Sequence, residues 1–116
     1  MITPEEIISR LGLEPHPGEG GYFVETYRAA ERLAAGALDR RYGGERSVGT
    51  AIYFLLTRET SSAMHLLQSD EVFHFYLGDP VEMLHLYPDG HGEVALLGPG
   101  ISGDIRPQIV VPRGVW

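Results

Sequence analysis

One stretch near the middle of the chain, MHLLQSDEVFHFYLG at residues 64–78, gathers imidazole and carboxylate side chains. It contains His65, Glu71 and His74. Successive residues of a strand point to opposite faces, so Glu71 shares a face with Phe73 and Phe75. A carboxylate in an apolar wall suits general acid or base catalysis. A solvated position at the start of the strand is the structural alternative for Glu71.

A second carboxylate follows the glycine-rich segment HPGEGG. In YFVETYR, residues 22–28, the alternation places Phe23, Glu25 and Tyr27 on one face and Arg28 on the other. Glu25 therefore repeats the arrangement of Glu71. The structural alternative is a salt bridge from Glu25 to an arginine across the sheet.

The remaining histidines have structural alternatives. His65 is also interpretable as a structural histidine. His74 alternates with Val72 and Tyr76 and is typical of packing on the outer face. His85 alternates with apolar residues of its strand and indicates a core or interface position.

Composition limits the classes of function. The 116 residues suit one domain, 1–116, with a formal net charge of −7. This charge disfavours nucleic-acid and membrane-surface partners, which require clustered basic residues. The absence of cysteine excludes disulfides and thiolate metal sites, and with no signal-like or membrane-spanning segment we expect a cytoplasmic location.

The elements that would position these residues are mostly strands. Thr3, Pro4 and Glu6 predict a capped helix over 3–12, and the polar segment 29–49 predicts a loop, with a helical turn possible within 31–38. Apolar segments separated by Gly and Pro turns predict strands between 22 and 112. Their ranges are 22–28, 50–57, 63–68, 71–77, 81–87, 93–98 and 108–112.

Many short strands joined by turns indicate an all-β sandwich or barrel that can enclose one small ligand. The segment 50–57 is apolar on both faces, so we expect a central strand or a subunit contact there.

The sequence resembles the cupin superfamily. The spacing of His65, Glu71 and Gly78 matches its first motif, and Pro112-Arg113-Gly114 is similar to part of its second. HPGEGGYFVETYR, SDEVFHFYLGDP and PQIVVPRGVW look like the small cupins catalogued as a domain of unknown function. This resemblance implies a jelly-roll barrel with one short N-terminal helix.

The match to the metal-binding cupins is incomplete. Leu67 occupies the position of the family's second histidine, and Glu59 stands where the leading glycine belongs. The resemblance leaves only His65 and Glu71 as candidate ligands of a divalent metal, so we expect no cofactor.

GGYFVETYR also resembles the opening motif of the dTDP-4-dehydrorhamnose 3,5-epimerase-like cupins, which use no metal. By that resemblance His65 is the catalytic base, held by a carboxylate such as Glu71 or Asp70. Glu25 and Arg28 would bind substrate. The substrate-binding residues predicted around this site are Glu25, Tyr27, Arg28, Phe73, His74 and Phe75.

The sequence ends at Val115-Trp116, whereas a jelly roll of this kind needs further pairing. We therefore expect either a fragment or a homodimer that supplies the missing strands.

Three functions fit these observations. The leading interpretation is a cupin that binds a small carbohydrate-like molecule and acts as an epimerase or isomerase. The alternatives are a metal-dependent dioxygenase or isomerase and a non-catalytic binding or sensing module.

Overall fold

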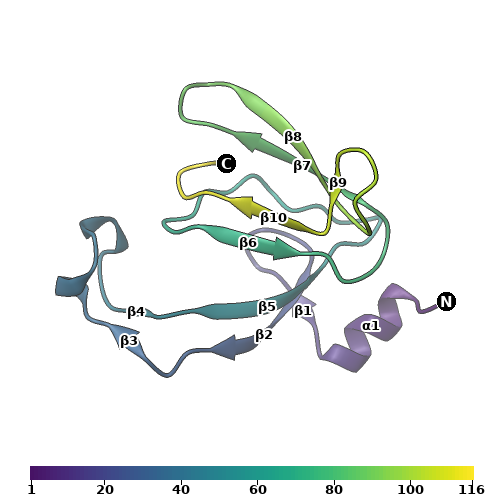
Figure 1. Ribbon diagram of the computed structural model, residues 1–116. Coiled ribbons are helices and arrows are strands. Elements are labelled where there is room, and N and C mark those ends of the chain that lie inside the picture. Colours follow the sequence, from purple (N-terminus) through teal and green to yellow (C-terminus); the bar gives the residue numbers. More distant parts are fainter. The chain divides into compact units, whose positions relative to one another are not determined.

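The computed structural model describes residues 1–116, which form two compact units, Met1–Met64 and His65–Trp116. The chain is mostly β with a single α-helix, and its strands form separate small sheets (Figure 1). The β-rich class and the one short helix agree with the sequence prediction. No sheet closes on itself.

The helix α1 spans Pro4–Leu11 in the first unit. Thr3 accepts a hydrogen bond from the Glu6 backbone N–H, and the Glu6 carboxylate accepts one from the Thr3 N–H. This reciprocal capping and a left-handed Gly12 define the two ends, as the sequence predicted. With eight residues, α1 is too short to cross a membrane, and no other helix of the structure could do so.

The main sheet of the first unit has the order β1-β2-β5 and is antiparallel. Its strands are β1 (Glu14–Pro15), β2 (Tyr22–Arg28) and β5 (Thr50–Leu55). The prediction of a strand at 22–28 is confirmed. β5 pairs with β2 alone, so it is not a central strand of this sheet.

A bulge in β2 makes the distribution of side chains differ from the one that simple alternation predicts. Glu25 pairs with Ile52, whereas Tyr27 pairs with Ala51. Paired residues share a face, and consecutive residues of β5 face opposite ways. Tyr27 therefore does not share the face of Glu25, contrary to the simple alternation, whereas Arg28, opposite Thr50, does.

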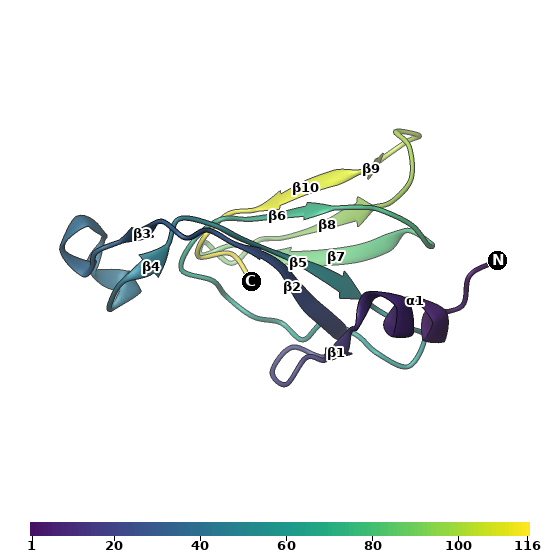
Figure 2. The same cartoon turned by 90° about the horizontal axis from the view of Figure 1, so that it is seen from below.

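The segment predicted as a loop contains a short ribbon. β3 (Arg32–Leu33) pairs with β4 (Arg46–Ser47), and two 3-10 turns, η1 (Ala35–Ala37) and η2 (Arg40–Tyr42), connect them. We call residues 29–49 the arm. Figures 1 and 2 both show the arm extending beyond the end of the β2–β5 pair.

The second unit contains two sheets. β6 (Glu71–His74) pairs antiparallel with β10 (Gln108–Val111). β7 (Val81–Leu86) pairs antiparallel with β8 (Gly92–Leu97), and β9 (Ile105–Arg106) runs parallel to β8. Parts of β10 and β8 lie close to each other.

The predicted strand at 63–68 is wrong. The segment has no ladder partner, and its backbone bonds instead to loops: Ala63 donates to the Glu19 carbonyl, and the Leu67 carbonyl accepts from Gly114. An apolar segment becomes a strand only where a sheet edge is available to pair with it.

Few side chains are buried. The buried apolar residues are Leu13, Ala29, Leu97 and Val115, and none of the large side chains is completely buried. Much apolar surface of the sheets is therefore exposed.

Candidate functional site

The second unit brings His65 and Glu71 together. His65 Nε2 lies 3.8 Å from Glu71 Oε1, with 26% and 31% of the two side chains exposed. His65 lies before the strand and Glu71 is the first residue of β6, with a bend of the chain at Gln68 and Ser69 between them. This half-buried pair can stabilise an imidazolium formed when the ring takes up a proton.

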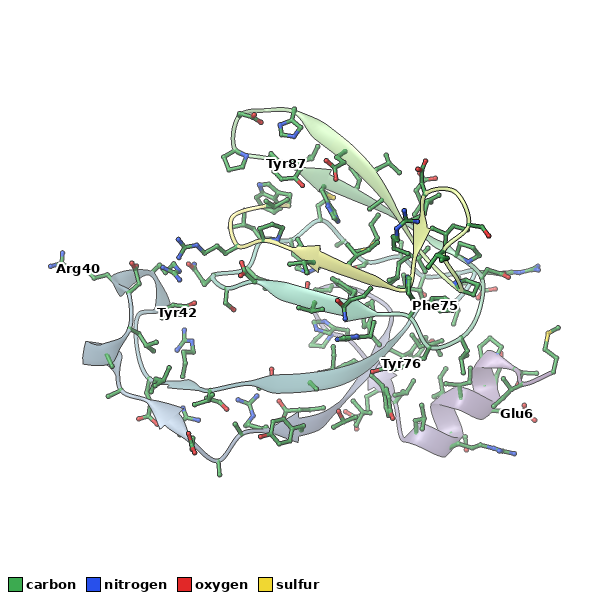
Figure 3. All side chains as sticks on the ribbon, in the orientation of Figure 1. Glu6, Arg40, Tyr42, Phe75, Tyr76 and Tyr87 are labelled. Carbon is green, nitrogen blue, oxygen red and sulfur yellow. The ribbon has the colours of Figure 1, made fainter.

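Glu71 lies on the half-buried face of the β6–β10 ribbon. Along β6, Glu71 and Phe73 are half-buried while Val72 and His74 are exposed. The cross-strand partners of Glu71 and Phe73 are Val111 and Ile109, which are also half-buried. Beyond the strand, Phe75 continues the half-buried series whereas Tyr76 is exposed (Figure 3). The expected aromatic face around Glu71 is present.

Asp70, the other carboxylate considered for His65, has a different partner. Its Oδ1 accepts a hydrogen bond of 2.9 Å from the backbone N–H of Arg113. Arg113 belongs to the Pro112-Arg113-Gly114 sequence, so this bond ties the second motif to the start of β6. Glu71, not Asp70, is therefore the carboxylate that the structure pairs with His65.

Because side chains alternate between the two faces of β6, His74 lies on the exposed face, opposite to the face of Glu71. Its Nδ1 is 3.4 Å from the side-chain nitrogen of Gln108, its cross-strand partner. This agrees with the outer-face interpretation, and a role of His74 in substrate binding stays a prediction.

Glu25 and Arg28 neutralise each other in the first unit. The bulge places them on one face, where Arg28 Nη2 lies 2.5 Å from Glu25 Oε1 and Nε lies 3.2 Å from Oε2. The hydrogen bond and charge of Glu25 raise the pKa of Arg28 above its ordinary value. The expected salt bridge exists, but within one strand rather than across the sheet. Tyr27 is exposed.

The residues present do not by themselves fit a protein metal site. Neither unit contains a group of three or more His, Asp or Glu side chains that could hold a metal ion. His65 and Glu71 are two donors, whereas catalytic zinc sites use three protein ligands.

The sequence predicts a core or interface position for His85. In the structure His85 is buried in the second unit. It is 4% exposed, on the same side of β7 as Val81 and Met83, and its Nε2 has no hydrogen-bond partner. Buried polar atoms are usually paired, so this nitrogen is a candidate contact for a bound molecule.

His91 is exposed in the turn between β7 and β8. Its ring stacks on Tyr87 with centroids 4.3 Å apart, and Figure 3 marks Tyr87 just after β7. The backbone N–H and ring of His91 bond to Asp89 and lower the pKa of that carboxyl. These contacts stabilise the turn.

A groove of about 360 Å³ lies in the first unit between α1, the start of β2 and the loop that follows β5. Its lining residues are Pro4, Glu5, Ile8, Tyr22, Thr57, Arg58 and Glu59. None of the predicted site residues lines it.

Comparison with known families gives one match over nearly the whole chain. Residues 5–116 match the family model described as Cupin superfamily (DUF985). A comparison with curated proteins finds no match.

Several solved structures resemble the chain, and two of them are described here. A protein from Shewanella oneidensis is 32% identical to this chain and has a TM-score of 0.83. The match covers 99% of this chain and 66% of the Shewanella protein. A hypothetical protein from Leishmania major is 34% identical to this chain and has a TM-score of 0.86. The match covers 98% of this chain and 67% of the Leishmania protein. The chain thus spans about two thirds of the length of each.

Proposed function

The chain belongs to the cupin superfamily (DUF985), and from this premise we propose that its second unit binds a small carbohydrate-like molecule and acts on it as an epimerase or isomerase. His65 is the base, and Glu71 stabilises the protonated ring. The observation that carries the proposal is the 3.8 Å separation of His65 Nε2 and Glu71 Oε1 in a half-buried position.

The proposed reaction moves one proton. The imidazole of His65 takes a proton from a carbon next to a carbonyl, and the electron pair left on that carbon forms an enolate. A water molecule donates a proton to the opposite face of the carbon, which gives the epimer, and the imidazolium of His65 releases its proton to solvent. Glu71 lowers the energy of the imidazolium by its negative charge.

Substrate contacts follow from the half-buried face that Glu71 shares with Phe73, which Phe75 continues beyond β6. Aromatic side chains offer large apolar surfaces beside which a sugar ring can pack. We assign Phe73 and Phe75 to this contact. Glu25, Tyr27 and Arg28 belong to the first unit, and their role in substrate binding stays a prediction.

The test is proton exchange in D₂O. Reducing sugars and nucleotide-linked keto sugars are incubated with the protein, and NMR follows loss of the signal of the C–H next to the carbonyl. We expect exchange with at least one of them, a loss of at least about 100-fold in His65→Gln, and a smaller loss in Glu71→Gln. His91→Gln, in the exposed turn between β7 and β8, is the matched control and should retain the wild-type rate.

Three outcomes would contradict the proposal. Equal rates in wild type and a folded His65→Gln would exclude His65 as the base. Loss of exchange after treatment with a chelator would favour the metal-dependent alternative. Binding of a sugar without any exchange would favour the non-catalytic module.

A further inference from the structure

The groove of the first unit has one wall on α1. Pro4, Glu5 and Ile8 of the helix line it, and the capping box at Thr3 fixes where the helix begins. All residues that line the groove belong to Met1–Met64, so the groove is a feature of this unit alone. Its helical wall is therefore set by local structure.

The other wall is a tight turn, residues 57–60. The Thr60 N–H donates a hydrogen bond of 3.2 Å to the Thr57 carbonyl, and the Thr57 N–H donates one of 2.8 Å to the Thr60 hydroxyl. The two hydroxyl oxygens lie 3.2 Å apart. These reciprocal bonds close the turn and hold Arg58 and Glu59 at its tip, where both line the groove.

The half-buried residues of the groove supply apolar surface. They are Ile8, Tyr22 and Thr57. Tyr22 is the first residue of β2 and is fixed there by pairing with Leu55. Its ring and Ile8 can pack against the methylene groups of a ligand, while the phenol hydroxyl offers a hydrogen bond.

Three charged side chains line the groove, Glu5, Arg58 and Glu59, and none of them forms an ion pair. The neighbouring Glu6, marked on α1 in Figure 3, is engaged, because its carboxylate accepts a hydrogen bond from the Thr3 N–H. Arg58 and Glu59 are adjacent in the sequence but do not pair with each other. Two carboxylates and one guanidinium are therefore available to a bound molecule.

We propose that this groove binds a free amino acid with a cationic side chain, of the lysine or arginine type. Its two positive groups match the carboxylates of Glu5 and Glu59, and its α-carboxylate matches the guanidinium of Arg58. The methylene chain between these groups packs on Ile8 and Tyr22. This site is separate from the proposed epimerase or isomerase site, because His65 and Glu71 belong to the second unit.

Size and charge favour this class of ligand over simpler ones. A volume of about 360 Å³ falls within the range of about 300–1,000 Å³ that is typical of small-molecule pockets. An inorganic anion would bind Arg58 but lie beside two carboxylates, and a metal cation would lie beside the guanidinium. A molecule with two positive groups and one negative group leaves none of the three side chains opposed by a like charge.

The experiment is isothermal titration calorimetry of the full chain with three ligands of the same length. These are L-lysine, L-norleucine, which lacks the side-chain ammonium, and cadaverine, which lacks the α-carboxylate. Each is added to about 10 mM, because contacts made by exposed charges are weak. Methyl NMR of the isoleucines locates the site, with Ile8 as the reporter in the groove and Ile105 as the reference in the second unit.

The variants are Arg58→Gln and Glu59→Gln. Arg10→Gln in α1 and Glu14→Gln in β1 are the matched controls, because they make the same charge changes at exposed positions outside the groove. Circular dichroism checks that all four variants fold.

We expect L-lysine to bind and to shift the Ile8 methyl signal. L-Norleucine and cadaverine should each bind at least about tenfold more weakly, and both groove variants should weaken lysine binding by a similar factor. The controls should match the wild type. In Arg58→Gln the preference for lysine over cadaverine should disappear, because the partner of the α-carboxylate is gone.

Four results would overturn the proposal. They are the absence of lysine binding at the highest concentration, equal affinity for the three ligands, a preference for lysine over cadaverine that persists in a folded Arg58→Gln, and binding that shifts Ile105 but not Ile8.

Discussion

The imidazole of His65 lies in a segment without a strand partner, yet the backbone around it is anchored. The Leu67 carbonyl accepts a hydrogen bond of 3.3 Å from Gly114, and Asp70 accepts one of 2.9 Å from the Arg113 N–H. Both bonds tie the segment before β6 to the turn after β10. A catalytic group on a loop needs such supports to keep its geometry.

Which carboxylate approaches His65 could not be predicted from residue types. Asp70 and Glu71 are adjacent in the sequence, and either could reach the ring. The choice depends on Arg113, which lies 43 residues further along the chain and donates a backbone hydrogen bond to the Asp70 carboxylate. The half-buried face shared by Glu71 and Phe73, by contrast, could be predicted, because the alternation of a strand is a local property.

His85 offers a test at the residue scale. Replacement by leucine removes a buried nitrogen without a partner, so we expect the free energy of unfolding to rise by about 1 kcal/mol. His74→Leu, on an exposed face, should change it by about 0.5 kcal/mol or less. Urea denaturation measures both variants. A marked loss of stability in His85→Leu would mean that the imidazole has a stabilising partner, such as a bound water.

The strand β2 shows which features of an element the sequence contains. Its bounds, Tyr22–Arg28, follow from its composition and the preceding glycines. The bulge does not, because it depends on the register with β5, a strand 22 residues further along the chain. The bulge nevertheless decides that Glu25 faces Arg28 rather than Tyr27.

The glycine turn before β2 has a structural reason. His16 Nδ1 accepts hydrogen bonds from the backbone N–H groups of Gly18 and Glu19, and Gly20 and Gly21 have φ values of +87° and +71°. Only glycine adopts such φ values at little cost.

Gly20→Ala should destabilise the first unit. The left-handed backbone costs about 1–2 kcal/mol for alanine, and its Cβ would also collide with the Ser61 carbonyl oxygen. Gly36→Ala, in the arm with no atom within 4 Å of a Cβ, is the matched control and should be close to neutral. The measurement is the midpoint temperature of thermal unfolding of each variant, compared with that of the wild type. Equal midpoints would contradict the geometry of the turn.

At the scale of the whole molecule, the composition predicted a turn-rich β chain with one short helix, and this is confirmed. The extent of burial could not be predicted, because it depends on which apolar faces find partners. Ile52, Leu84 and Val94 are exposed although their strands are paired. Their exposure therefore means that nothing packs on those faces of the sheets, and not that the segments are unfolded. Apolar residues in paired strands are where contacts with ligands or further protein are expected.

The central claim concerns the site of the second unit, and one measurement addresses it directly. Side-chain ¹⁵N spectra of the histidines are recorded while a nucleotide-linked keto sugar is added to the protein. We predict that the His65 signals shift in proportion to occupancy, that the signals of His91 in the exposed β7–β8 turn do not, and that Glu71→Gln weakens the response. A sugar that binds and shifts other histidines while the His65 signals remain unchanged would contradict the account.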